Sequence, residues 1–206
     1  MVDAPITPRE ALRLLTDGNR RFVDGRRDHP NQDADRRAAV APAQRPFAVL
    51  FGCSDSRLAA EIIFDRGLGD LFVVRTAGHV LGPEVMGSIE YGVAVLDTPL
   101  VAVLGHDSCG AVAAAMEASR NGAMPRGAIR SVVERVLPSV LAVGSRGGDA
   151  GAEHVRFTVN MLASESATIA GRIADGRCAV AGLSYQLADG GVRLIAEQGL
   201  DEPSGR

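Results

Sequence analysis

Short apolar runs alternate with amphipathic segments over most of the chain. Four of these runs are apolar throughout and too short for helices. They are 47–51, 71–74, 100–104 and 178–183. Each of the first three is followed by a segment with helical spacing of its apolar positions, near 59–64, 84–96 and 111–119. Continuous apolar strands that alternate with helices predict a mostly parallel β-sheet flanked by helices on both faces.

Two longer helical patterns follow the third predicted strand. The first covers 132–143, with Pro138 as an expected kink. The second is one apolar stripe from Val155 to Ile173, in which Ser166 fills one position. The glycine-rich stretch 144–151 between them is predicted to be a flexible connector.

The C-terminal part predicts a change of strand direction. Ala188–Gly191 is typical of a tight turn, so 192–195 is expected to return as an antiparallel edge strand. The polar tail after Gly199 is expected to be frayed. The pattern as a whole predicts an α/β fold with about four parallel strands plus one antiparallel edge strand.

The N-terminal segment carries a helix start signal. Thr7, Pro8 and Glu10 form a capping-box pattern, and the apolar positions that follow predict a helix from Pro8 to Val23. A polar loop is expected over 25–35. Because this helix lies far from the strand–helix pattern, a partner subunit is one place where its apolar face can be buried. We treat 1–206 as one domain with an N-terminal arm over 1–45.

Composition narrows the class of protein. The chain has 206 residues, of which 46% are hydrophobic, and a net charge of -3, so we expect one globular domain and no nucleic-acid partner. All 22 basic residues are Arg, and their scattered runs indicate solvated surface rather than a phosphate site. The chain has no bilayer-spanning apolar run and no apolar leader, so we expect a cytoplasmic protein without membrane contact. Three Cys argue against a disulfide scaffold.

Candidate metal ligands follow two predicted strands at their carboxyl ends. Cys53 follows the first strand, and His106 and Cys109, spaced as His-x-x-Cys, follow the third. Ligands of parallel sheets bind beyond these ends, so we expect the three residues to meet at one rim. Zinc prefers Cys and His, and a site with three protein ligands leaves a position for water. The alternatives are two buried thiols with a core His, or a Cys109 nucleophile with His106 as base, which leaves Cys53 without a role.

Two further residues extend the first motif. Asp55 can accept a hydrogen bond from a zinc-bound water, and the Arg57 guanidinium can grip that carboxylate and keep it ionised. Such help is needed because two thiolates cancel the charge of the metal and leave its water less acidic. The alternative is a local salt bridge that caps the following helix.

These motifs resemble the signature of β-class carbonic anhydrases. The signature is carried by Cys53-Ser-Asp55-Ser-Arg57 and by Gly105-His106-x-x-Cys109-Gly110. The resemblance runs from 18–22 through 74–78 and 88–91 to the strand that contains Cys178, and is greatest to actinobacterial members.

The resemblance implies a reaction and roles for single residues. Cys53, His106 and Cys109 would hold Zn²⁺, and Asp55 and Arg57 would form a catalytic dyad. The reaction would be reversible hydration of carbon dioxide to bicarbonate and a proton, with zinc hydroxide as the nucleophile. In a closed state at lower pH, Asp55 would become the fourth zinc ligand. The family also forms homodimers or dimers of dimers, with the N-terminal helix laid over the neighbouring subunit.

Two rival functions stay open on the same scaffold. One is a related zinc hydrolase of carbon disulfide or carbonyl sulfide, and the other is a non-catalytic zinc-binding homologue. The family likeness places Gly110, Tyr91 and Val80 at the substrate pocket, although a plain core position is equally open for Tyr91. Arg66 stands in the segment where plant-like members carry a substrate-binding Gln. Arg75 matches one residue of a bicarbonate-inhibition pocket, but the chain has no Trp to complete that pocket.

The remaining Cys and His residues carry weaker signals. Cys178 lies in an apolar run and is expected to be inert core. His79 could relay protons, but an interface or loop role is favoured. His29 and His154 are expected at the surface.

Overall fold

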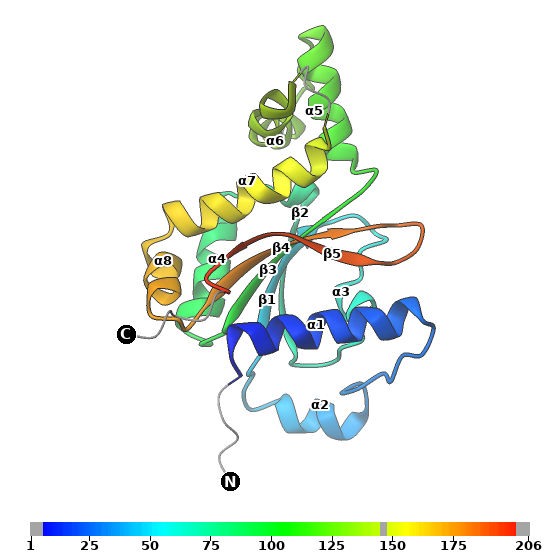
Figure 1. Cartoon of the computed structure of the whole chain (residues 1–206), viewed down its shortest axis with the longest axis vertical. Coiled ribbons are helices and arrows are strands. Elements are labelled where there is room, and N and C mark those ends of the chain that lie inside the picture. The colour runs from blue at the N-terminus through cyan, green and yellow to red at the C-terminus, as the bar shows by residue number, and fades with distance from the viewer. Residues whose placement is uncertain (1–5, 145–147, 201–206) are drawn as a thin grey trace.

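A computed structural model of the chain describes residues 6–144 and 148–200. In this part a five-stranded sheet lies between two layers of helices (Figure 1). The strands are β1 (Ala48–Cys53), β2 (Leu71–Thr76), β3 (Leu100–His106), β4 (Ala179–Tyr185) and β5 (Val192–Gln198). Their spatial order is β2-β1-β3-β4-β5, with β5 antiparallel to β4 and the other pairs parallel. The predicted fold class is therefore confirmed.

Each helical segment predicted from the sequence is present, and one further short helix follows the N-terminal one. The helices are α1 (Pro8–Val23), α2 (Ala34–Val40), α3 (Ala60–Ile63), α4 (Pro83–Ala94), α5 (Gly110–Asn121), α6 (Ile129–Val143), α7 (Ala150–Glu165) and α8 (Ala167–Ala174), with a 3-10 turn η1 (Ala77–His79) after β2. The helix predicted over Pro8–Val23 is confirmed as α1. α2 was not predicted, because it buries no residue and therefore leaves no apolar periodicity.

Ser166 divides the predicted apolar stripe into two helices. Its extended backbone ends α7, and its hydroxyl accepts from the Ile169 N–H at 3.1 Å and donates to Glu90 Oε1 at 2.6 Å. Leu162 before the break and Ile169 after it are both fully buried. The apolar pattern therefore continues through a break that it cannot reveal.

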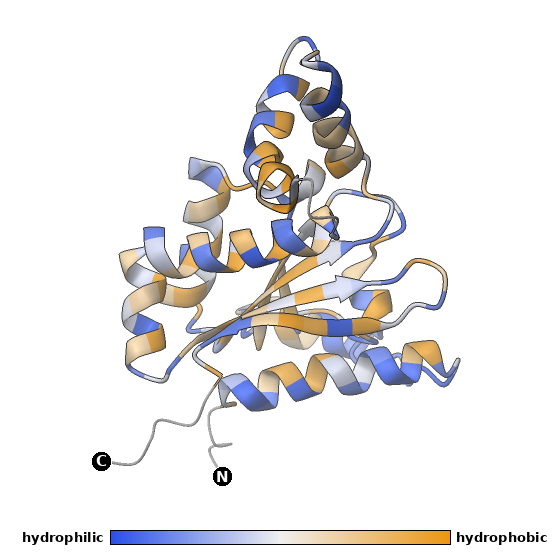
Figure 2. Cartoon of the chain, turned by 45° about the horizontal axis from the view of Figure 1, so that its top comes forward, coloured by the Kyte–Doolittle hydropathy of each residue, from blue (hydrophilic) through white to orange (hydrophobic). Residues whose placement is uncertain are grey.

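Each face of the sheet has its own apolar core. On one face Leu50 lies in a cluster with Leu15 of α1 and Ile63 of α3. On the other face Phe51 lies in a cluster with Val159 of α7. Figure 2 shows apolar residues gathered in the strands, while α1 carries both apolar and polar positions. β1 and β3 are buried along their whole length, which makes the ends of these two strands a rigid base for a site.

The apolar face of α1 is buried on its own chain. Ala11 and Leu15 have no exposed surface. The buried Asn19 donates to the Ile63 carbonyl at 3.2 Å and accepts from the Val192 N–H at 2.9 Å. The helix thus needs no partner subunit to cover this face. The argument from the sequence, that a partner subunit could bury it, is therefore wrong. Packing of α1 on a neighbouring subunit stays a prediction.

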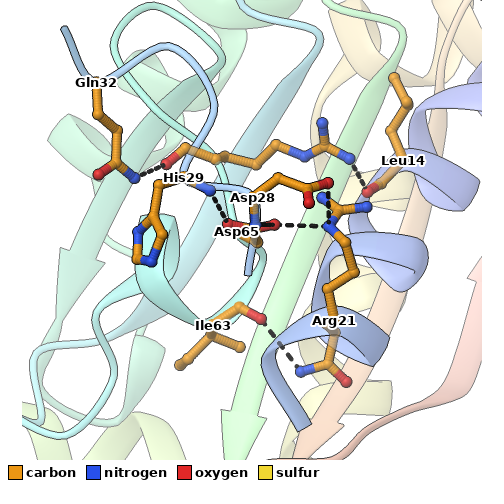
Figure 3. A network of polar contacts seen from close by, with 9 residues as sticks. Leu14, Arg21, Asp28, His29, Gln32, Ile63 and Asp65 are labelled. Carbon is orange, nitrogen blue, oxygen red and sulfur yellow. Dashed lines mark hydrogen bonds and ion pairs between the residues drawn. The ribbon is translucent and has the colours of Figure 1, made fainter. Parts of the chain in front are cut away.

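A buried carboxylate ties the segment after α1 to the end of α3 (Figure 3). Asp65 accepts from Arg21 Nε at 2.6 Å and from the N–H groups of Asp28 and His29 at 3.0 Å. Burial opposes ionisation, but these donors keep the pKa of Asp65 below its ordinary value. His29 itself is exposed, as expected.

Two predictions fall partly outside the described residues. Of the connector predicted over 144–151, residues 145–147 lie outside them, and α7 already begins at Ala150. Of the tail after Gly199, only Leu200 is described; it is buried, and its carbonyl accepts from Arg9 at 2.6 Å. Among residues 6–144 and 148–200, no helix is long and apolar enough to cross a membrane.

Candidate metal centre

Cys53, His106 and Cys109 meet at the carboxyl-end rim of the sheet. Cys53 ends β1, His106 ends β3, and Cys109 is the residue before α5. Their ligand atoms lie within 4.8 Å of one another, and all three residues are buried. Tetrahedral zinc with ordinary bond lengths needs these atoms roughly 3.5–3.8 Å apart, so the cluster needs only a small contraction.

The chemistry of these donors also fits a metal ion. Both ring nitrogens of His106 are buried and have no hydrogen-bond partner in the described part of the chain, a costly arrangement that a metal on one nitrogen relieves. A hydrogen bond from Cys109, aided by the Gly78 N–H at 3.3 Å from Sγ, lowers the pKa of the Cys53 thiol. Two thiolates and one imidazole are donors that zinc prefers.

Arg57 grips Asp55 beside this cluster. Its Nε donates to Oδ1 at 2.9 Å and its Nη2 donates to Oδ2 at 2.7 Å, while its backbone N–H donates to Oδ1 at 2.9 Å. These bonds hold the pKa of Asp55 well below its usual range. Asp55 does not cap the following helix, because α3 begins at Ala60 and its N-cap residue, Ala59, has no side-chain cap. The bidentate contact predicted from the sequence is therefore present.

Arg75 fixes the backbone of the same loop. From β2 its Nε donates to the Cys53 carbonyl at 2.9 Å, and its Nη2 donates to the Asp55 carbonyl at 2.6 Å. The sequence offered one signal for this role: Arg75 is a charged residue directly after the apolar run 71–74, and it lies within β2. It thus fixes the backbone of the loop that carries the Cys53 thiol and the Asp55 carboxylate.

A cavity of about 550 Å³ borders the metal cluster. Its lining includes His106 and Cys109, together with the start of α5 and the start of α7. The three pocket residues expected from the family likeness are not part of this lining. Gly110 is exposed at the first turn of α5, Val80 is buried in the core, and Tyr91 is half-exposed on α4 with its ring 6.1 Å from that of Phe72. A core position for Tyr91 is therefore wrong within this chain.

His154 was expected at the surface, and that expectation is wrong. The residue is 2% exposed, with its Nδ1 at 3.0 Å from Ser139 Oγ and its Nε2 at 2.9 Å from the Gly78 carbonyl. Its ring centroid lies 4.5 Å from that of His79, which is also buried. The spacing of Val155 and Val159 marks this side of α7 as apolar, and a His beside such a stripe gives no further signal.

His79 lies in the turn η1 after β2, as the loop alternative expected, and it is buried within its own chain. Burial, together with the nearby His154 and His106, holds its pKa well below the ordinary value. The ring therefore stays neutral at physiological pH, which argues against a proton relay. Cys178 is buried as expected, and burial raises the pKa of its thiol to about 12, so it is inert.

Gly78 adopts a left-handed backbone conformation that other residues rarely adopt. Its φ is 65°, and a Cβ added there would lie 2.6 Å from the Cβ of Ala111. Gly78→Ala is expected to lower the free energy of unfolding by about 2–4 kcal/mol, from backbone strain and overpacking together. Urea unfolding measures this loss.

Gly122→Ala is the matched control for that experiment. Gly122 has a φ of 72° but has no atom within 4 Å of an added Cβ, so only the backbone cost applies. A loss of about 1–2 kcal/mol is expected there. Equal losses at Gly78 and Gly122 would contradict tight packing of Gly78 against α5.

Comparisons with known proteins identify a family and relatives of this chain. A family model described as carbonic anhydrase matches residues 48–192, which include both metal motifs. Over 188 residues the chain is 56% identical to carbonic anhydrase 2 of Mycobacterium tuberculosis (strain H37Rv), covering 89% of this chain and 90% of that protein. Over 196 residues it is 54% identical to the carbonic anhydrase of Mycolicibacterium smegmatis, covering 93% and 95%.

A solved structure of similar fold is a β-carbonic anhydrase of Sordaria macrospora, described as tetrameric. It superposes with a TM-score of 0.70 at 22% identity and covers 78% of this chain and 86% of its own. At this identity the likeness concerns the fold, which agrees with the fold class expected from the resemblance.

Proposed function

This chain belongs to the carbonic anhydrase family, with the fold of the β class, and we propose that it catalyses reversible hydration of carbon dioxide. Cys53, His106 and Cys109 hold Zn²⁺ in this proposal, and Asp55 and Arg57 assist the reaction. The observation that carries the proposal is the convergence of three buried ligand atoms beside a carboxylate that is kept ionised.

Zinc held by these residues supplies Lewis-acid activation of a water molecule toward carbon dioxide. Asp55 accepts a hydrogen bond from the reacting water and orients it. Each carboxylate oxygen can accept about two hydrogen bonds. Arg57 fills both places on Oδ1 but only one on Oδ2, so Oδ2 keeps one acceptor place for the water.

Arg57 has a second role in this account. By keeping Asp55 anionic it ensures that the carboxylate accepts from the water rather than donating to it. Arg75 holds the carbonyls of Cys53 and Asp55, so a zinc ligand and the orienting oxygen keep a fixed relation. A closed state with Asp55 as fourth zinc ligand requires the three bonds from Arg57 to break, and it stays a prediction.

One experiment distinguishes the candidate substrates. Zinc-loaded protein is assayed for hydration of carbon dioxide and, in the same preparation, for hydrolysis of carbon disulfide and carbonyl sulfide. We expect rapid hydration of carbon dioxide and slow or absent release of hydrogen sulfide. Fast release of hydrogen sulfide without carbon dioxide hydration would favour the hydrolase, and inactivity toward all three would favour a non-catalytic zinc protein.

We further propose that the chain acts as a homodimer or as a dimer of dimers. β2 pairs only with β1 in the described part of the chain, so its apolar outer edge has unpaired backbone groups. Tyr91 of α4, whose ring lies 6.1 Å from that of Phe72 in β2, is 46% exposed, and Val95, which follows α4, is 63% exposed. An apolar sheet edge of this kind is expected to be covered by a second copy. The tetrameric relative in fold supports this proposal.

The domain extent and the cellular location complete the proposal. We propose that 1–206 is one carbonic anhydrase domain with 1–45 as an N-terminal arm, which is supported by the hydrogen bonds that Arg21 and Asp28 of this arm donate to the buried Asp65. A cytoplasmic location is supported by three cysteines that are all free, since disulfides are rare in reducing compartments.

A further inference from the structure

Hydrogen bonds connect Ser139 and His154 to the metal cluster through Gly78. Ser139 lies on α6 and His154 on α7, and both are at most 2% exposed. The Ser139 hydroxyl contacts His154 Nδ1 at 3.0 Å, and His154 Nε2 contacts the Gly78 carbonyl at 2.9 Å. The N–H of Gly78 in turn donates to Cys53 Sγ at 3.3 Å. A line of hydrogen bonds therefore runs from α6 to a thiolate.

The chemistry of the groups fixes the direction of these bonds. A carbonyl oxygen only accepts, so His154 Nε2 must carry the proton that it donates to Gly78. Nδ1 of the neutral ring is then the acceptor, and the Ser139 hydroxyl donates to it. The neutral form agrees with the surroundings, because burial lowers the pKa of His154.

The turn that His154 contacts is strained and needs external support. Gly78 has a φ of 65°, and His79 follows with a φ of 41°, a conformation that residues other than Gly rarely adopt. Strained backbone persists only where neighbouring groups hold it. The His154 ring holds the Gly78 carbonyl, while Thr76 Oγ1 closes the turn by donating to the Val80 carbonyl at 3.1 Å.

We propose that His154 is a positioning residue for Cys53, and that Ser139 holds His154 in the required tautomer. His154 keeps the Gly78 N–H directed at the thiolate. This bond draws electron density from sulfur, so Cys53 neutralises less of the metal charge than a bare thiolate would. The inference rests on the proposed function, because it requires Cys53 to be a zinc ligand.

Replacement of His154 tests this directly. His154→Leu fills the space without a donor, whereas the side-chain amide of His154→Gln places an N–H near the Nε2 position. Loss of a partner of a metal ligand typically costs about 10–100-fold in metal affinity, and we expect about tenfold for His154→Leu. His154→Gln is expected to restore most of the affinity, measured by competition with a chelator.

Cobalt substitution gives a second readout that general destabilisation does not move. A thiolate without its N–H donor is more electron-rich, so the thiolate-to-cobalt charge-transfer band of His154→Leu is expected at longer wavelength. Ser139→Ala should shift the band in the same direction by less, since it removes only the hydroxyl that fixes the tautomer of His154. Ser139→Ala also keeps the test decisive if His154→Leu does not fold.

Thr158→Val is the matched control. Thr158 lies one turn later on α7, is 2% exposed, and donates only to the His154 backbone carbonyl at 2.8 Å. It should leave zinc affinity and the cobalt band unchanged.

The results of the other variants decide the test. Wild-type zinc affinity and band position in both His154→Leu and Ser139→Ala would overturn the inference, as would an equal loss of zinc affinity in His154→Leu and His154→Gln. If instead wild-type protein binds no zinc, or Cys53→Ala keeps the full thiolate band, the proposed function itself fails.

Discussion

Cys53→Ala is expected to remove zinc from the protein and to reduce carbon dioxide hydration to the background rate. Only His106 and Cys109 would remain of the three ligands that meet within 4.8 Å. Four-ligand structural zinc sites bind with roughly 10–16 kcal/mol, so one ligand contributes ~3 kcal/mol, or more than a hundredfold in affinity. Zinc content after dialysis and hydration rate are the two measurements.

Cys178→Ala deletes the same atom at the opposite end of the sheet. Cys178 precedes β4, whose first residue pairs with the first residue of β3, whereas the metal cluster lies at the other end of β3. This variant should keep one zinc ion per chain and full activity. A full complement of zinc in Cys53→Ala would contradict the ligand assignment, whatever its activity.

Asp55→Asn is expected to keep zinc and lose most of its activity. An amide has a single oxygen, so it cannot accept from Arg57 through two oxygens and still accept from the reacting water. Positioned proton acceptors contribute about 10²–10⁴-fold to rates, and we expect a loss of about 100-fold or more in kcat. Because Arg57 holds the pKa of Asp55 well below its usual range, the loss should be similar throughout the neutral and alkaline range.

Two variants control for this result. Asp97→Asn removes an exposed carboxylate that pairs with Arg172 at 2.7 Å and Arg177 at 2.8 Å, and its φ of 55° is one that Asn tolerates. It should leave turnover unchanged. Arg57→Lys keeps the charge but not the two-pronged grip, so an intermediate loss is expected. Normal turnover in Asp55→Asn would remove Asp55 from the mechanism.

Local signals in the sequence predicted much of the fold. The start of α1 follows from a capping box that acts over three residues, and the structure contains that box. The strands follow from uninterrupted apolar runs. The meeting of Cys53 and His106 follows from a general property of parallel sheets, in which carboxyl ends share one edge. Each of these inferences needs only neighbours in sequence or a rule of topology.

What the sequence could not predict depends on contacts between distant segments. The break at Ser166 is invisible because the apolar stripe continues across it, and α2 has no buried face to detect. The burial of His154 and its contact with Gly78 join residues 76 positions apart. The grip of Arg75 on the Cys53 loop spans 22 positions and depends on the pairing of β1 with β2. The pattern of apolar and polar positions alone assigns such residues to the surface or to the core according to their residue type.

The rate of carbon dioxide hydration by protein with a measured zinc content tests the central claim most directly. Stopped-flow assays are made on one preparation before chelation, after chelation and after zinc is restored. The account predicts a kcat/KM within the ordinary enzyme range of about 10⁴–10⁸ M⁻¹s⁻¹ that disappears with the metal and returns with it. Background rates at one zinc ion per chain would contradict it.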